Sequence, residues 1–264
     1  MPNRAAALPA AAVAVAALAV SGCGVQIHMG PRSVTDEAAV TGQVTAVQLA
    51  AGSGDIRIRA GQDQGATIHR TIDYRGRTKP HPSQRLSGGV LTFVPGCTHC
   101  SIDYDLTVPA ATQVRIRTGS GSIRVAEVAA ADLQTGSGDV GVRDVQGAVR
   151  AHTGSGSIMI TSIGAQADLH TSSGDIIATS VRGGTLRAET GSGSVTLKFS
   201  SAPSNVLAVT GSGDVRIRVP GGPYRVDQST KSGDDSVQVP TDPSAPAVIV
   251  ARTGSGSLTI APAG

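Results

Sequence analysis

Aromatic side chains are almost absent from this chain. Its 264 residues contain no Trp, 3 Tyr and 2 Phe, so aromatic residues make up only 2% of the sequence. A groove that binds sugars by stacking is therefore poorly supplied. Charged residues make up 16%, and the formal net charge is only +3. This small balance, with arginines interleaved among acids, argues against a nucleic-acid partner.

Long hydrophobic runs are missing except near the start. Residues 5–20 form an apolar stretch after Arg4 that is too short to predict a membrane span, so residues 1–22 are predicted to be a signal peptide. The stretch ends in Leu-Ala-Val-Ser-Gly-Cys, which resembles the lipobox of bacterial lipoproteins. This resemblance implies cleavage before Cys23, acylation of its thiol, and an anchor on the outside of the cell membrane. An ordinary secretory signal with an incidental cysteine is the alternative. Residues 23–42 are expected to be the acylated cysteine and a flexible tether.

Cysteine is scarce, and its other two copies lie close together as Cys97 and Cys100. Haem attachment would need a histidine directly after the second cysteine, where the chain has Ser101. A structural zinc site would need a second pair of ligands, and none is evident. We therefore predict a small structural disulfide formed in an oxidising compartment.

Glycine, in contrast, is abundant and periodic. The tripeptide Ser-Gly-[Asp/Ser] occurs nine times, at spacings of 67, 17, 18, 18, 19, 20, 20 and 23 residues. A fixed period of this length indicates a repeat architecture. The serines are Ser53, Ser120, Ser137, Ser155, Ser173, Ser192, Ser212, Ser232 and Ser255.

Apolar and polar residues alternate on both sides of each tripeptide. Alternation over about five residues predicts a half-buried strand, and glycine permits the sharp corner between two strands. Each repeat is therefore expected to be one coil of about 17–23 residues with two strands. The predicted fold is all-β, a β-helix-like solenoid over residues 43–264, with an irregular excursion or cap at 60–112.

An antiparallel meander or sandwich is the alternative fold. The outward residue four positions before each corner helps to choose between the two. It alternates in sign through five successive copies, as Arg115, Asp132, Arg150, Asp168 and Arg187. Opposite charges on neighbouring parallel strands are favourable, whereas a meander would not place these strands side by side. The alternation therefore favours the stacked solenoid.

The repeated Thr-Gly-Ser-Gly-[Asp/Ser], the lipobox and the segment Asp-Tyr-Asp-Leu-Thr-Val-Pro at 103–109 together resemble one bacterial family. It is the putative-adhesin, β-strand-repeat family of unknown function. The resemblance covers about residues 43–264. It implies a right-handed β-helix-like fold and a location in the cell envelope. No catalytic residues carry over from it.

Two patterns could indicate a metal site, but simpler interpretations account for both. Asp residues recur at the corners on every second coil, about 9.6 Å apart, which is too far for two of them to share one calcium ion. His152 and His170 take equivalent positions on adjacent coils, but a solvated ladder of side chains is the simpler interpretation. We expect no metal and no cofactor.

Function is harder to predict than fold. We expect a non-catalytic adhesion or interaction module that binds an unknown envelope protein or polymer. A passive or stress-linked scaffold and a β-helix carbohydrate-active enzyme are the alternatives. Exposed apolar residues can mark a contact site, unless the 60–112 excursion covers them. Self-association through the C-terminal coil, which only residues 261–264 would cover, is a further expectation. The candidate interaction residues are Met159, Ile177, Leu207, Val209, Arg216 and Arg218.

Overall fold

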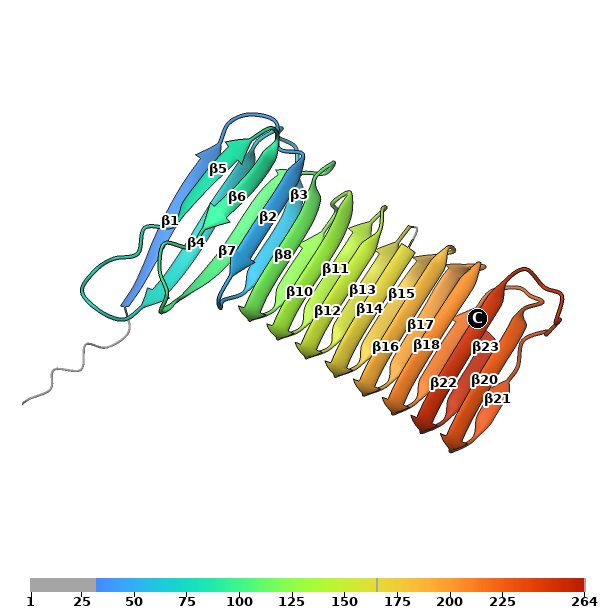
Figure 1. Cartoon of the computed structure of the whole chain (residues 1–264). Helices are drawn as coiled ribbons and strands as arrows, with labels where there is room; N and C mark the ends of the chain where they lie inside the picture. The colour runs from blue at the N-terminus through green and yellow to red at the C-terminus, as the bar shows by residue number, and fades with distance from the viewer. Residues whose placement is uncertain (1–31, 165, 264) are drawn as a thin grey trace, which may run out of the picture. The chain divides into compact units, whose positions relative to one another are not determined.

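The computed structural model describes residues 32–164 and 166–263, which are built from strands and turns. The predicted signal peptide, the sequence that resembles a lipobox and Cys23 lie outside the described residues. Twenty-three strands form two facing sheets of 12 and 11 strands (Figure 1). Within the described part of the chain, no helix is long and apolar enough to cross a membrane.

Both sheets run along the length of the stack. In spatial order, the 12-stranded sheet consists of β1 (Arg32–Val40), β4 (Ala66–Tyr74), β7 (Cys100–Pro109), β3 (Ile56–Gly61), β9 (Ile123–Ala126), β11 (Val140–Val145), β13 (Ile158–Ile163), β15 (Ile176–Arg182), β17 (Val195–Ser201), β19 (Val215–Val219), β23 (Leu258–Pro262) and β21 (Asp235–Val237). The 11-stranded sheet consists of β20 (Arg225–Ser232), β22 (Val248–Ser255), β18 (Asn205–Ser212), β16 (Thr185–Ser192), β14 (Gln166–Ser173), β12 (Val149–Ser155), β10 (Ala130–Ser137), β8 (Gln113–Ser120), β2 (Ala46–Ala51), β6 (Val90–Val94) and β5 (Ser83–Ser87).

Each repeat is one coil with one strand in each sheet, as the sequence predicts. Neighbouring coils pair in parallel and in register, so that Thr135 faces Thr153 and Ile158 faces Ile176. This parallel pairing confirms the solenoid and rules out the meander. The alternating charges do lie on adjacent strands, and Arg115 reaches Asp132 at 3.3 Å.

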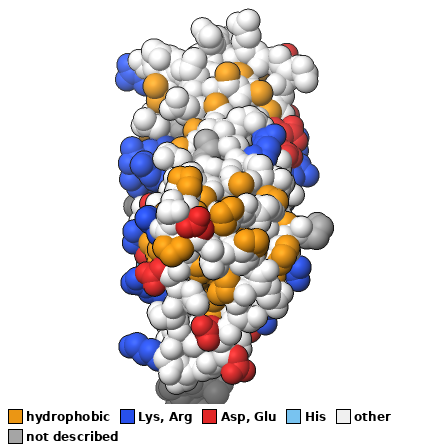
Figure 2. All heavy atoms as spheres, turned by 90° about the vertical axis from the view of Figure 1, so that its right-hand side faces the viewer, with side chains coloured by type: hydrophobic (Ala, Val, Ile, Leu, Met, Phe, Trp, Pro, Cys, Tyr) orange, Lys and Arg blue, Asp and Glu red, His pale blue; other side chains and the backbone are white. Residues whose placement is uncertain are grey.

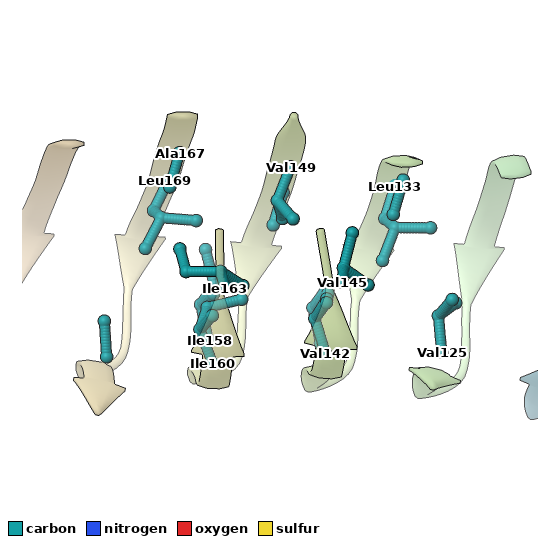
Figure 3. Close-up of a cluster of buried hydrophobic side chains, with 14 of the residues drawn as sticks. Val125, Leu133, Val142, Val145, Val149, Ile158, Ile160, Ile163, Ala167 and Leu169 are labelled. Atoms are coloured by element: carbon teal, nitrogen blue, oxygen red, sulfur yellow. The ribbon is translucent and has the colours of Figure 1, made fainter. Parts of the chain in front are cut away.

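The core lies between the two sheets. The side chains at the alternating apolar positions are buried, and Figure 3 shows them gathered between strands of both sheets, Leu133, Val142 and Ile160 among them. One coil cannot bury these side chains by itself, so stability depends on the coils stacked on either side. The predicted assignment of inward and outward positions is confirmed.

A column of buried threonines runs beside the corners. Thr153 is fully buried, and its hydroxyl Oγ1 lies 2.9 Å from the carbonyl oxygen of Gly138 on the preceding coil and 3.2 Å from that of Ser155 on its own coil. Thr135, Thr171, Thr190 and Thr210 repeat this pattern. The column therefore adds a side-chain link between neighbouring coils at the corner, where the carbonyl oxygen of Ser155 also accepts from the backbone N–H of Gly138.

A second column at the corner alternates Asp and Ser without interruption. Its members in spatial order are Asp55, Ser122, Asp139, Ser157, Asp175, Ser194, Asp214, Ser257 and Asp234. Four of the carboxylates accept a hydrogen bond from the backbone N–H of the next serine, at 2.8–2.9 Å. The aspartates therefore serve to link coils.

Spatial order departs from sequence order at the C-terminal end. The coil of β22 and β23 lies between the coil of β18 and β19 and the coil of β20 and β21. The expectation that only residues 261–264 cover the last coil is therefore wrong. The reason is polarity: Ile249 and Leu258 are fully buried and need neighbours on both sides, whereas β20 and β21 place Gln228 and Asp235 at inward positions.

Figure 2 looks onto this end of the stack, where hydrophobic side chains gather near the centre and acidic side chains lie around them. Val226 and Val237 are only half-buried there, and Asp235 is exposed. A charge at an inward position of an edge strand opposes pairing with another sheet edge. The end coil therefore resembles the polar capping repeat that solenoids need for solubility.

The excursion at 60–112 forms a cap on the opposite end. Its strands β4 and β7 extend the 12-stranded sheet, with β4 antiparallel to both β7 and β1, and its strands β5 and β6 extend the 11-stranded sheet. The excursion therefore lies beyond the first coil and does not cover the middle of either sheet.

The tether predicted for 23–42 is wrong over its second half. Residues 32–40 form β1, which pairs with β4 along its whole length. The strand was missed because Asp36 and Ala38 interrupt the apolar alternation between Val34 and Val40; Ala38 is paired with Ile68, and Asp36 is paired with Arg70. Only the partner strand shows that Asp36 has a role inside the cap.

Candidate functional site

The candidate interaction residues do not lie on one surface. Met159, Ile177, Arg216 and Arg218 lie on the outer face of the 12-stranded sheet, on β13, β15 and β19. Leu207 and Val209 lie on β18, on the outer face of the opposite sheet. The Gly-Ser-Gly corner folds each coil in two, so residues before and after it point to opposite sides of the domain. The set predicted from the sequence must therefore be divided.

Between β3 and β19, the outward strand positions of the 12-stranded sheet carry charges of one sign, whereas the next strand, β7, brings Asp105 beside Arg57. From β3 to β19, two outward residues per strand give fourteen positions on seven neighbouring strands. None of the fourteen is a carboxylate, and seven are basic: Arg57, Arg59, Arg124, Arg143, Lys198, Arg216 and Arg218. Between the basic groups lies Met159, whose exposure of 56% is high for an apolar residue. We call this surface the cationic face.

The equivalent outer face of the 11-stranded sheet carries both signs. Over the same seven coils it has Arg115, Arg117, Arg150 and Arg187 beside Asp132, Asp168 and Glu189. Arg187 lies 4.0 Å from Asp168 and donates to Glu189 at 2.8 Å. The two outer faces of one solenoid therefore differ strongly in net charge, and we call this second surface the mixed face.

A hollow lies in the cationic face near its N-terminal end. Gly141 sits between Arg124 and Met159 on neighbouring strands, and Ala126 sits between Arg59 and Arg143. These two small residues leave a shallow cavity of about 470 Å³. Sequence reasoning missed this hollow, although the alignment of repeats shows a glycine where the flanking copies have Arg and Met.

Carboxylates line the rim of the hollow. Asp105 is 3.8 Å from Arg57 and 3.7 Å from Arg59, and Asp55 is 3.9 Å from Arg124. Arg143 lies 3.6 Å from Glu127 and 3.6 Å from Asp144 at the other corner. These contacts are long, and the four arginine side chains stay 52–63% exposed. The guanidinium groups are oriented by the rim but remain accessible.

Glu127 and Asp144 both have a positive backbone φ angle, which places their side chains at the rim. Together with Ser162 and Ser180 they have φ of 54–62°, at the second corner of four neighbouring coils. The left-handed conformation is uncommon for residues with a side chain. The glycines of this corner, such as Gly147 and Gly164, stand two or three residues later, so the sequence does not mark the left-handed residues themselves.

The mixed face holds the histidine pair and an apolar patch. The rings of His152 and His170 are stacked with centroids 4.8 Å apart and planes 12° apart. Among the described residues, no group of three or more His, Cys, Asp or Glu side chains is placed to hold a metal ion. Farther along, Leu207 pairs with Val250, and both are half-buried.

The N-terminal cap encloses a buried arginine that the sequence analysis did not single out. The side chain of Arg70 is 1% exposed; it donates to Asp36 at 2.7 Å and to the side-chain oxygen of Gln84. Its guanidinium carbon lies 6.0 Å from the centre of the Phe93 ring. Burial raises the pKa of the neighbouring Tyr104, although the charge of Arg70 acts to lower this pKa. Arg70, together with Asp36 and Gln84, closes the space between the sheets at this end.

Cys97 and Cys100 form a disulfide in the structure, with Cα atoms 6.0 Å apart. Both cysteines are half-buried against the core; Cys100 begins β7, and Cys97 lies in the loop before it. The bridge therefore ties down the loop between β6 and β7 within the cap.

The comparison with known families places the chain. The model of the Toastrack DUF4097 family matches residues 101–260, from β7 to β23. The chain belongs to the Toastrack DUF4097 family. The match begins after most of the cap, so the Toastrack repeats are the coils themselves. This agrees with the resemblance found in the sequence, and the family's description names no activity.

Solved structures of similar fold come from bacteria. A putative adhesin from Bacteroides fragilis is 14% identical, with 88% of this chain and 97% of that chain covered and a TM-score of 0.47. A putative adhesin from Parabacteroides distasonis is 12% identical, with 87% and 97% covered and a TM-score of 0.45. At such identities these likenesses carry no functional conclusion. No curated protein matches the chain.

Proposed function

We propose that this chain is a non-catalytic adhesion or interaction module, held by an acylated Cys23 on the outside of a bacterial cell membrane. Its cationic face is the binding surface. The observation that carries the proposal is the difference between the two outer faces, since only the cationic face has basic groups and no carboxylate at its outward strand positions, around the exposed Met159.

The arrangement suits binding better than chemistry. The five aromatic side chains, Tyr74, Phe93, Tyr104, Phe199 and Tyr224, are all buried. The aspartates at the corners are engaged with backbone N–H groups of neighbouring coils. What remains accessible is a broad sheet surface with basic groups at both ends, on strands about 4.8 Å apart. Such a surface can bind a partner through many contacts that are individually weak.

Crosslinking in living cells tests this proposal. A photo-reactive residue replaces Met159 on the cationic face in one variant and Leu207 on the mixed face in another, and adducts are identified by mass spectrometry. The proposal predicts adducts with a discrete protein or polymer from position 159, and few from position 207. Adducts at position 159 with membrane lipid or other copies of the chain alone would instead indicate a passive scaffold.

A further inference from the structure

The hollow in the cationic face has a shape and charge that select a class of ligand. Four guanidinium groups, those of Arg57, Arg59, Arg124 and Arg143, surround a floor made by Gly141 and Ala126. Guanidinium groups present paired N–H donors that match the oxygens of a carboxylate or a phosphate. Met159 forms one wall and offers an apolar contact beside them. We propose that this hollow binds an acidic polysaccharide; this proposal rests on the proposed function and names its ligand.

The extent of the face favours a polymer over a single small molecule. Beyond the hollow and the apolar pair Met159 and Ile177, basic groups return at Lys198, Arg216 and Arg218. From β3 to β19 there are six strand spacings, or about 29 Å. A polysaccharide laid across the strands would contact the arginines of the hollow and the second cluster at Lys198, Arg216 and Arg218 at the same time. Linked contacts of this kind strengthen binding.

Three other anionic partners fit the surface less well. Single-stranded nucleic acid is bound largely by bases stacked on aromatic rings, and the aromatic side chains of the chain are buried. A lipid surface would favour a flat or protruding apolar contact, whereas the basic groups here surround a depression. An extended protein segment gains specificity from pockets that hold alternate side chains, whereas this hollow is a single shallow depression. A sugar unit with a charged group fits both the size and the chemistry of the hollow.

The rim carboxylates set the conditions for binding. Asp55, Asp105, Glu127 and Asp144 already balance part of the arginine charge, at N–O distances of 3.6–3.9 Å. A ligand carboxylate or phosphate would form shorter, charge-assisted hydrogen bonds in their place. Because the site is exposed, its affinity should fall steeply with added salt.

Gly141 allows the hollow to be filled without damage to the fold. Its φ lies outside the left-handed region, and an added Cβ would be 3.6 Å from the nearest atom, the Cγ of Arg124. Threonine is favoured over glycine within a strand. Gly141→Thr should therefore remove the ligand space and leave the thermal melting temperature unchanged or raised.

Binding to three forms of one polymer tests the proposal. The full chain carrying Cys23→Ser, which removes the predicted acyl site, is titrated with carboxymethyl dextran, phosphorylated dextran and neutral dextran by calorimetry. We expect binding to one or both acidic forms, and the stronger one identifies the preferred group. Gly141→Thr and the double variant Arg124→Gln/Arg143→Gln should each weaken binding by about tenfold or more. The matched double variant Arg117→Gln/Arg150→Gln on the mixed face should change it by less than about twofold.

Several outcomes would overturn the proposal. Equal losses in the two double variants, or no effect of Gly141→Thr, would show that the hollow is not the site. Tighter binding to phosphatidylglycerol vesicles or to single-stranded DNA than to either acidic dextran would show that the ligand class is wrong. A failure to bind any of these, together with discrete adducts from position 159 in cells, would reject the polysaccharide while leaving the interaction module in place.

Discussion

The glycines at the first corner meet two demands at once. Gly138 has φ of +138°, and a Cβ at this position would lie 2.3 Å from the carbonyl oxygen of Gly121 on the preceding coil. Both the conformation and the close approach of backbones therefore require the absence of a side chain.

Replacement of this glycine by alanine should weaken the fold. We predict that Gly138→Ala lowers the free energy of unfolding by at least about 1–3 kcal/mol, the usual cost of a strained backbone conformation. Gly141→Ala is the control, because its added Cβ has only ordinary contacts. Urea denaturation of both variants measures the difference. Equal stability of the two would show that the corner does not need glycine.

One corner aspartate, Asp214, makes stability depend on pH. Asp214 accepts hydrogen bonds from the backbone N–H of Ser257 at 2.8 Å and from Arg216 at 2.7 Å. The hydrogen bond from Ser257, helped by the charge of Arg216, holds the pKa of Asp214 below its usual value, although desolvation acts in the opposite direction. A carboxyl group with a lowered pKa in the folded state stabilises the fold above its unfolded pKa of about 3.9. This contribution is lost as pH falls through the folded pKa.

Asp214→Asn should therefore be less stable than the wild type at pH 6. The difference should shrink once the pH falls below about 3.9, as the wild-type carboxylate takes up its proton. Urea unfolding at a series of pH values measures both proteins, and the effect will be modest because the group is exposed and screened. A difference that stays constant down to pH 2 would contradict this role.

At the scale of elements, the exchanged order of the last two coils leads to a prediction about backbone hydrogen exchange, which does not depend on side-chain chemistry. The strand β20 forms the edge of the 11-stranded sheet, and β22 lies inside it, although β22 is closer to the C-terminus of the chain. Edge strands open more readily, because one side of their backbone is unpaired.

Protection from hydrogen exchange should therefore be higher in the C-terminal strand β22 than in β20, which precedes it in the sequence. We expect amides of β22, such as those of Ile249 and Ala251, to be better protected than amides of β20, such as those of Val226 and Gln228. Exchange followed by mass spectrometry or NMR measures this directly. Better protection in β20 would show that the coils stack in sequence order.

Most of the strands and coils could be predicted from the repeats, and the exceptions have physical causes. Period and alternation fix each coil, because glycine corners and apolar positions recur in register. The order of coils depends on which coil can tolerate solvent at the end, and only Gln228 and Asp235 hinted at this. The cap was harder to predict because the partner of Arg70 is Asp36, which lies in a segment without the repeat pattern.

At the scale of the whole described domain, the two outer faces have separate characters. The sequence identified the outward residues correctly, but it pooled those before the corner with those after it. Met159 and Leu207 therefore seemed to share a surface, whereas the folded coil places them on opposite sheets. The cationic face emerges only when each strand is assigned to its sheet, so the site could not be predicted from the alignment of repeats alone.

The measurement that tests the cationic face most directly is attachment of bacterial cells under flow. Cells produce equal amounts of the wild-type chain or of one of two variants with four Arg→Gln substitutions. The first variant changes Arg57, Arg124, Arg143 and Arg216 on the cationic face, and the second changes Arg115, Arg117, Arg150 and Arg187 on the mixed face. We predict that only the first variant loses attachment. Equal attachment by both variants and the wild type, or a loss confined to the second variant, would contradict the assignment of the binding surface.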